Sequence, residues 1–213
     1  MDKITTIYCD FDGTITKNDA VNTFFEKYAD PKWIDFENLW INGEISSMDN
    51  AIKQVSLLPN LSEKQVDDYI ETVEIDDDFV EFTNYLKANN IKLVILSDGF
   101  DLFIQKTLEK YNINDIEIYA NHITLENSRF KITFPYHNHL CEKGAGMCKC
   151  EKINEKEFVY IGDGTSDLCV AKKATILFAT KKLQKYCENS SIGHYPFNSF
   201  KDIIKTINNI NGK

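Results

Sequence analysis

Five side chains with acidic or hydroxyl groups follow three apolar, strand-like segments of the chain. They are Asp10, Asp12, Ser97, Asp163 and Asp167. An isolated Asp-x-Asp pair is more often a turn with local side-chain hydrogen bonds. In extended chain, however, Asp10 and Asp12 project to the same side, where one could act as a nucleophile and the other as an acid or base. If the three segments are neighbouring parallel strands, all five side chains meet at one edge of a sheet.

Four carboxylates gathered at one edge repel one another. Two unit charges about 4 Å apart repel by roughly 4 kcal/mol at an effective dielectric constant of about 20. A divalent cation removes this cost, and ligands that are all oxygen atoms suit Mg²⁺. The same cation would allow an anionic carboxylate to approach an anionic phosphate.

The elements that position these residues alternate between strand and helix. Strands are predicted at 4–9, 92–96, 116–120, 158–161 and 175–179, and helical apolar stripes begin near 20, 48, 66, 79, 100 and 200. Residues 123–134 alternate around Asn127-Ser128, which indicates a small antiparallel hairpin. Such alternation predicts an α/β fold with a parallel sheet and helices on both faces.

The helical run between the first and second strands is far too long for a simple crossover. We expect it to be a small helical cap over the carboxyl edge of the sheet, where open α/β sheets bind ligands. The predicted division is therefore a core of residues 1–15 and 76–213 and a helical cap of residues 16–75.

Charge and composition narrow the class of protein. The 213 residues carry a net charge of −9, and Arg129 is the only arginine, so a nucleic-acid partner is not expected. Apolar runs are too short to span a membrane, which needs about 20 residues. Met1-Asp2-Lys3 leads directly into a strand-like stretch without a signal-peptide core. We therefore expect a cytoplasmic protein with reduced thiols, in which Cys9 and Cys169 are buried as small hydrophobic side chains.

Several motifs, taken in order, resemble those of phosphatases of the haloacid-dehalogenase (HAD) superfamily. They are Asp10-Phe11-Asp12-Gly13-Thr14, Ser97, a lysine, and Gly162-Asp163-Gly164-x-x-Asp167. The stretch from Cys9 to Asp19 is similar to the methionine-salvage phosphatases that act on 2-hydroxy-3-keto-5-methylthiopentenyl 1-phosphate. The stretch from His137 to Cys150 is similar both to these and to phosphocholine and phosphoethanolamine phosphatases, with phosphoserine phosphatases as more distant relatives.

The resemblance implies a Rossmann-like HAD core, a phosphomonoesterase activity and a role for each motif residue. Asp10 would attack phosphorus and become an aspartyl phosphate, and Asp12 would act as acid and then as base. Mg²⁺ would be held by Asp10, the backbone carbonyl of Asp12, and Asp163, with Asp167 as a direct ligand or a support. Ser97 and the backbone N–H groups near Gly13 and Gly99 would contact the phosphoryl group.

The motif lysine has three candidates, Lys143, Lys149 and Lys152. Met147-Cys148-Lys149 fits the family pattern, so we expect Lys149 to contact the phosphate. Asp19 stands nine residues after the nucleophile, where phosphoserine phosphatases place a glutamate that holds the substrate ammonium. It could contact the substrate or simply cap the helix that begins near Ala20.

Two other interpretations stay open at this point. The segment with His137, His139, Cys141, Cys148 and Cys150 has enough soft ligands for zinc or a redox role, although a loop at the rim of the pocket is the simpler reading. A phosphotransferase on the same scaffold, or a non-catalytic metal or redox sensor, are alternatives to a phosphatase. The expected partner is a small phosphorylated metabolite, for a protein that is a monomer or a homodimer.

Overall fold

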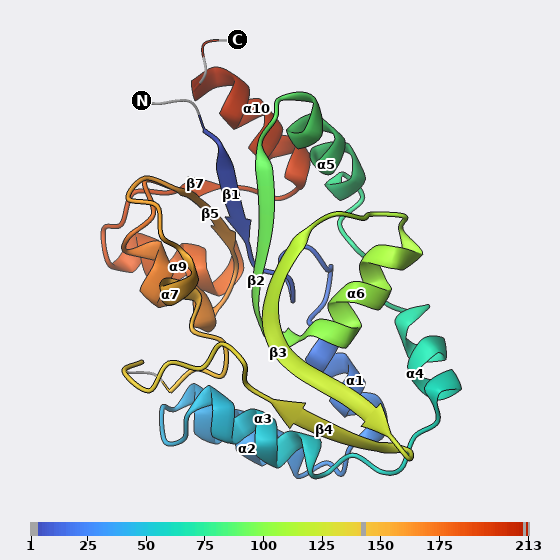
Figure 1. Ribbon diagram of the computed structural model, residues 1–213. Coiled ribbons are helices and arrows are strands. Elements are labelled where there is room, and N and C mark those ends of the chain that lie inside the picture. The colour runs from blue at the N-terminus through green and yellow to red at the C-terminus, as the bar shows by residue number, and fades with distance from the viewer. Residues whose placement is uncertain (1–3, 142–143, 211, 213) are drawn as a thin grey trace.

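The computed structural model describes residues 4–141, 144–210 and 212. Its centre is a seven-stranded sheet in the order β4-β3-β2-β1-β5-β6-β7 (Figure 1). The strands are β1 (Thr6–Cys9), β2 (Lys92–Phe100), β3 (Glu117–Glu126), β4 (Arg129–Thr133), β5 (Val159–Gly162), β6 (Ile176–Ala179) and β7 (Tyr195–Pro196). All neighbouring pairs are parallel except β3 and β4, which form an antiparallel hairpin.

Helices cover both faces of the sheet and one of its ends. They are α1 (Ala20–Tyr28), α2 (Trp33–Ile41), α3 (Ser47–Val55), α4 (Glu63–Ile70), α5 (Phe79–Ala88), α6 (Asp101–Lys110), α7 (Lys149–Lys152), α8 (Leu168–Ala171), α9 (Lys181–Asn189) and α10 (Phe200–Ile210), with a 3₁₀ turn η1 (Thr165–Asp167) before α8. In the described residues no helix is long and apolar enough to cross a membrane.

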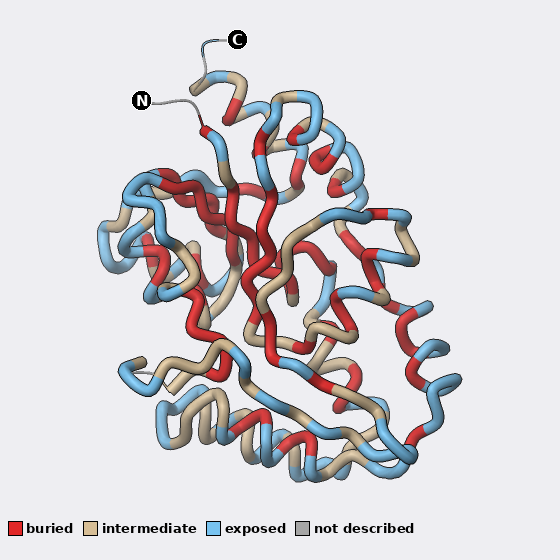
Figure 2. The backbone as a smooth tube through the Cα atoms, viewed as in Figure 1, coloured by how far each residue is buried: buried red, intermediate tan, exposed pale blue. Residues whose placement is uncertain are grey.

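The two faces of the sheet have separate apolar cores because successive side chains of a strand point in opposite directions. Ile7 and Cys9 of β1 pack with buried residues of α5, α6 and α10. Tyr8, between them, packs on the other face with residues of α8 and α9. Figure 2 shows the buried backbone running through the middle of the sheet. The central strands therefore give rigid support to the residues that follow their carboxyl ends.

Helices α1 to α4 form the long insertion between β1 and α5, and they lie at one end of the sheet together with the β3–β4 hairpin (Figure 1). A third apolar cluster joins them: Phe24 and Phe25 of α1 are fully buried with Phe103 of α6 and Ile123 of β3. The hairpin thus packs with the inserted helices. The division into a core and a cap of residues 16–75 remains a prediction.

Most predicted elements are present, and the departures have physical causes. Helix α2 lies within the predicted helical run but was not singled out as an element, because none of its residues is buried and no one-sided apolar stripe marks it. Strand β2 continues to Phe100, which was expected to begin the next helix. Ser62 and Gln65 form a capping box at the start of α4. The predicted hairpin turn is confirmed, with positive φ values of 50° at Asn127 and 64° at Ser128.

Candidate active site

The carboxyl ends of β2, β1 and β5 lie side by side and carry the predicted functional residues. Cys9 of β1 is in register with Ile95 of β2 and with Ile161 of β5. The residues that follow these positions therefore leave the sheet at one level. In this way the topology brings Asp10, Asp12, Ser97, Asp163 and Asp167 to a single edge, as the sequence predicted.

Asp10 is held rigidly at the end of β1. Its backbone N–H donates to the carbonyl of Ile161 at 2.9 Å, and its Oδ1 accepts from the backbone N–H of Phe11 at 2.8 Å. The residue is only 5% exposed. Burial raises the pKa of Asp10 well above its usual value, and the negative charge of Asp167 raises it further, while Lys149 lowers it. The carboxylate therefore needs positive charge nearby to stay ionised.

Lys149 provides one such charge. Its Nζ lies 2.9 Å from Oδ1 of Asp10 and 2.7 Å from Oδ1 of Asp167, and it donates to Oγ of Ser166 at 3.1 Å. The lysine is 2% exposed. Burial lowers the pKa of Lys149, but the charges of Asp10 and Asp167 raise it more, so the ammonium stays protonated. The other two candidates differ: Lys152 stacks over Tyr136, and Lys143 lies outside the described residues.

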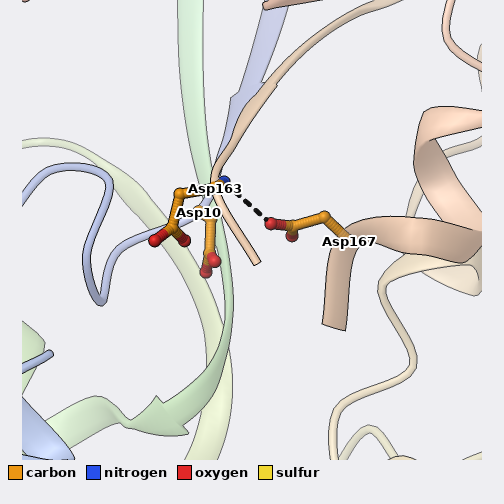
Figure 3. A group of neighbouring side chains, drawn as sticks. All are labelled: Asp10, Asp163 and Asp167. Atoms are coloured by element: carbon orange, nitrogen blue, oxygen red, sulfur yellow. Dashed lines mark hydrogen bonds between the residues drawn. The ribbon is translucent and has the colours of Figure 1, made fainter. Parts of the chain in front are cut away.

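Asp10, Asp163 and Asp167 form a tight carboxylate cluster (Figure 3). One oxygen atom from each lies within 4.8 Å of those of the other two, and in the described residues no other group of three His, Cys, Asp or Glu side chains does this. Burial raises the pKa of Asp163, and the charge of Asp167 adds to the effect. A hard divalent cation such as Mg²⁺ suits a site in which all the ligand atoms are oxygens that repel one another.

Asp167 differs from the other two acids because its oxygens are already used. Oδ2 accepts from the backbone N–H of Asp163 at 3.1 Å (Figure 3) and from that of Gly164 at 3.0 Å. Oδ1 accepts from Lys149 and from the hydroxyl of Tyr160. This pattern favours a supporting role for Asp167, in which it orients the turn that carries Asp163.

Asp12 lies in the connection from β1 to α1, where the inserted helices begin. Its Oδ1 accepts from the backbone N–H of Ala20 at 3.0 Å, and Oγ of Ser97 is 3.5 Å from its Oδ2. Burial raises the pKa of Asp12 to about 8, with a further contribution from the charge of Asp19. At neutral pH the carboxyl group therefore holds a proton that it could donate.

Two predicted glycines have no room for a side chain. A Cβ at Gly99 would lie 2.2 Å from Oδ2 of Asp12, and the backbone N–H of Gly99 donates to Oγ of Ser97 at 2.9 Å. A Cβ at Gly13 would lie 2.6 Å from Oδ2 of Asp163, and Gly13 has a φ of +74°. Both glycines are needed because the backbone comes close to the carboxylates.

Asp19 caps helix α1, which was one of its two predicted roles. Its side chain accepts from the backbone N–H of Asn22 at 2.8 Å. Burial raises the pKa of Asp19 to about 6, and nearby carboxylates contribute, those of Glu37 first and Asp163 second. The side chain is therefore close to the other acids as well, so capping does not rule out contact with a ligand.

Two residues of this region were not assigned any role from the sequence. Lys181 at the start of α9 lies 3.6 Å from Oδ2 of Asp163 and donates to the carbonyl of Gly13. Asp98, inside the Ser97-Asp98-Gly99 motif, accepts from the backbone N–H of Met147 at 3.1 Å and so ties the loop before Lys149 to β2. Lys181 has no signal in the sequence, whereas the motif position could have drawn attention to Asp98.

The cysteines near the site lie in pairs. The thiols of Cys141 and Cys148 are hydrogen-bond partners, and so are those of Cys150 and Cys169. Cys9 is buried as predicted, but the prediction for Cys169 was wrong: it is exposed, because it lies on the outer side of the short helix α8. Three converging soft ligands, as zinc requires, are not found in residues 4–141 and 144–210.

The comparisons with known proteins agree with this geometry. The family model described as "Putative Phosphatase" matches residues 5–181. The chain belongs to this family. A Bacillus cereus protein named 2-hydroxy-3-keto-5-methylthiopentenyl-1-phosphate phosphatase is 34% identical over 204 residues, covering 92% of this chain and 93% of its own. A Bacillus thuringiensis protein of the same name is 33% identical, with the same coverage.

A solved structure has the same fold. A substrate-bound phosphoserine phosphatase matches 97% of this chain and 99% of its own with a TM-score of 0.68, at 22% sequence identity. The likeness confirms the predicted fold class, a Rossmann-like HAD core with a parallel sheet and a helical insertion after the first strand. The family membership confirms the predicted resemblance to HAD phosphatases.

Proposed function

We propose that this chain is a Mg²⁺-dependent phosphomonoesterase that hydrolyses 2-hydroxy-3-keto-5-methylthiopentenyl 1-phosphate through an aspartyl phosphate on Asp10. Family membership supports the reaction class, and the names of the Bacillus relatives support the substrate. The observation that carries the mechanism is the placement of buried Asp10 between Lys149 and the carboxylate of Asp163.

In the first step, an oxygen of the Asp10 carboxylate attacks phosphorus. The bond between phosphorus and the leaving oxygen breaks, and the leaving oxygen takes a proton from the carboxyl group of Asp12. Since the pKa of Asp12 is raised to about 8, this proton is in place at neutral pH. Lys149, Ser97 and the N–H of Gly99 would hold the phosphoryl oxygens.

In the second step, water attacks the phosphorus of the aspartyl phosphate. Asp12, now ionised, takes a proton from that water, and the bond between phosphorus and Asp10 breaks. Inorganic phosphate leaves, and both aspartates return to their starting states. The acid of the first step thus becomes the base of the second.

The residues that would hold Mg²⁺ are Asp10, Asp163 and the backbone carbonyl of Asp12. When bound, the cation would neutralise charge between the carboxylates and the phosphate. Asp167, whose oxygens are occupied, would keep Asp163 and Lys149 in place. Lys181 would add positive charge beside Asp163.

The proposed partner is a small phosphorylated metabolite, for a monomer or homodimer in the cytoplasm. All six cysteines are free, which suits a reducing compartment. Phosphocholine, phosphoethanolamine and phosphoserine are the competing substrates. Phosphate release by the purified protein from each compound and from the enol phosphate, with Mg²⁺, tests the assignment: the enol phosphate should give the highest kcat/KM, and a higher value for any other compound would contradict it.

A further inference from the structure

A carboxylate of the inserted helices is held in a fixed position by two buried amides. Oε2 of Glu37 on α2 accepts from Nδ2 of Asn50 at 3.0 Å and from Nε2 of Gln54 at 3.1 Å. Asn50 and Gln54 lie on α3 and are only 6% and 3% exposed. Within the described chain, no lysine, arginine or histidine lies within ion-pair distance of Glu37, and Oε1 has no hydrogen-bond partner. One oxygen is anchored and the other is available.

The helix face that holds Glu37 leads to the catalytic edge. Ser47, Asn50 and Gln54 are spaced by three and then four residues, so they share one face of α3. Oγ of Ser47 accepts from the backbone N–H of Gly146 at 3.3 Å, and the next N–H, that of Met147, donates to Asp98, the residue after Ser97. The polar face thus begins beside the proposed phosphate contact and continues away from it to Glu37.

The pKa shifts of the site agree with this placement. The charge of Glu37 raises the pKa of Asp19, and the charge of Asp19 raises that of Asp12. The buried Oδ1 of Asn50 has no hydrogen-bond partner in the described structure.

We propose that Oε1 of Glu37 is a specificity determinant that accepts a hydrogen bond from the hydroxyl on carbon 2 of the enol phosphate. This inference rests on the proposed function. The hydroxyl is the one hydrogen-bond donor that the leaving group contains, next to the carbon that carries the phosphate. An anchored carboxylate is an acceptor suited to it, because a charge-assisted hydrogen bond needs no reorganisation of the protein.

The alternative is that Glu37 has only a structural role and does not contact the substrate. Helix α2 has no buried residue, so the two amide bonds could serve only to tie it to α3. Glu37→Gln distinguishes these roles. Its side-chain oxygen can still accept from both amides, which keeps the tie, but its NH₂ group then faces the substrate and replaces an acceptor with a donor.

The experiment compares the enol phosphate with p-nitrophenyl phosphate, whose leaving group has no donor. We expect Glu37→Gln to lower kcat/KM about ten- to hundred-fold for the enol phosphate. For the aryl phosphate the change should stay below about three-fold, and the melting temperature should not change. Glu44→Gln, the same change at an exposed residue of the connection between α2 and α3, should alter neither substrate.

The outcomes separate this inference from the proposed function. An equal fall for both substrates, or no fall for the enol phosphate, with an active wild-type protein would overturn the role of Glu37 alone. A wild-type protein that cleaves the aryl phosphate but not the enol phosphate would overturn the proposed function and this role together. If Glu37→Gln instead abolishes a dominant phosphoethanolamine activity, the site binds an ammonium group, and the hydroxyl assignment is wrong.

Discussion

The ammonium nitrogen of Lys149 lies 2.9 Å from Oδ1 of Asp10, and both side chains are almost fully buried. The same nitrogen lies 2.7 Å from Asp167. One lysine therefore compensates two buried acids before any phosphate binds. An approaching phosphate would join a charge network that is already in place, which reduces the cost of ordering the site.

Lys149→Met should remove most of the activity and also destabilise the metal-free protein. The change leaves Asp10 and Asp167 buried without their cation, and breaking a buried ion pair in this way typically costs about 3–5 kcal/mol. Urea unfolding in EDTA at neutral pH measures the loss. Lys152→Met, in the same short helix but outside the acid cluster, is the control. Equal stability of the two variants would mean that the Lys149 contacts are unimportant.

The raised pKa of Asp12 predicts how stability depends on pH. Its usual value is 3.8, and in the folded protein it is about 8. This carboxyl group therefore favours the folded state fully below about pH 4, and the contribution is lost as pH rises through about 8. In EDTA, the melting temperature should fall from about pH 5 to about pH 8, and it should fall less for Asp12→Asn. Parallel curves for the two proteins would contradict this.

The sequence predicted that the five side chains meet at one edge of the sheet, because the signals for this are local. Each motif follows an apolar strand, and parallel strands bring their carboxyl ends together whatever lies between them. The residues that the inserted helices and α9 bring to the site were harder to predict. Glu37 lies on an exposed helix with no apolar stripe, and its partners Asn50 and Gln54 come from another helix. Lys181 is likewise brought to Asp163 only by tertiary structure.

Asp19 caps α1, and we propose that it also has a chemical role; two substitutions should separate the two roles. Asp19→Ser keeps a side-chain oxygen that can cap α1, whereas Asp19→Ala loses it and should cost about 1 kcal/mol of stability. Both remove the charge near Asp12, so both should lower kcat/KM for the enol phosphate more than for an aryl phosphate. If Asp19→Ser is fully active on both substrates, the residue is only a helix cap.

Metal dependence follows from the oxygen-only cluster of Asp10 and Asp163. Activity should be lost in EDTA and return with Mg²⁺. Ca²⁺ should restore it poorly, because it takes more ligands at longer distances and would misplace the attacking oxygen. Phosphate release after metal exchange is the measurement, and full activity in EDTA would rule out the proposed role of the metal.

The covalent role of Asp10 is the central claim, and rapid quenching of the reaction with the enol phosphate tests it most directly. Peptide mass spectrometry of the quenched protein should find the phosphoryl group on Asp10. Asp10→Asn should carry no phosphoryl group and should lose turnover by several orders of magnitude, with its melting temperature retained. Phosphate release by an active Asp10→Asn variant, or a phosphoryl group on another residue, would contradict the account.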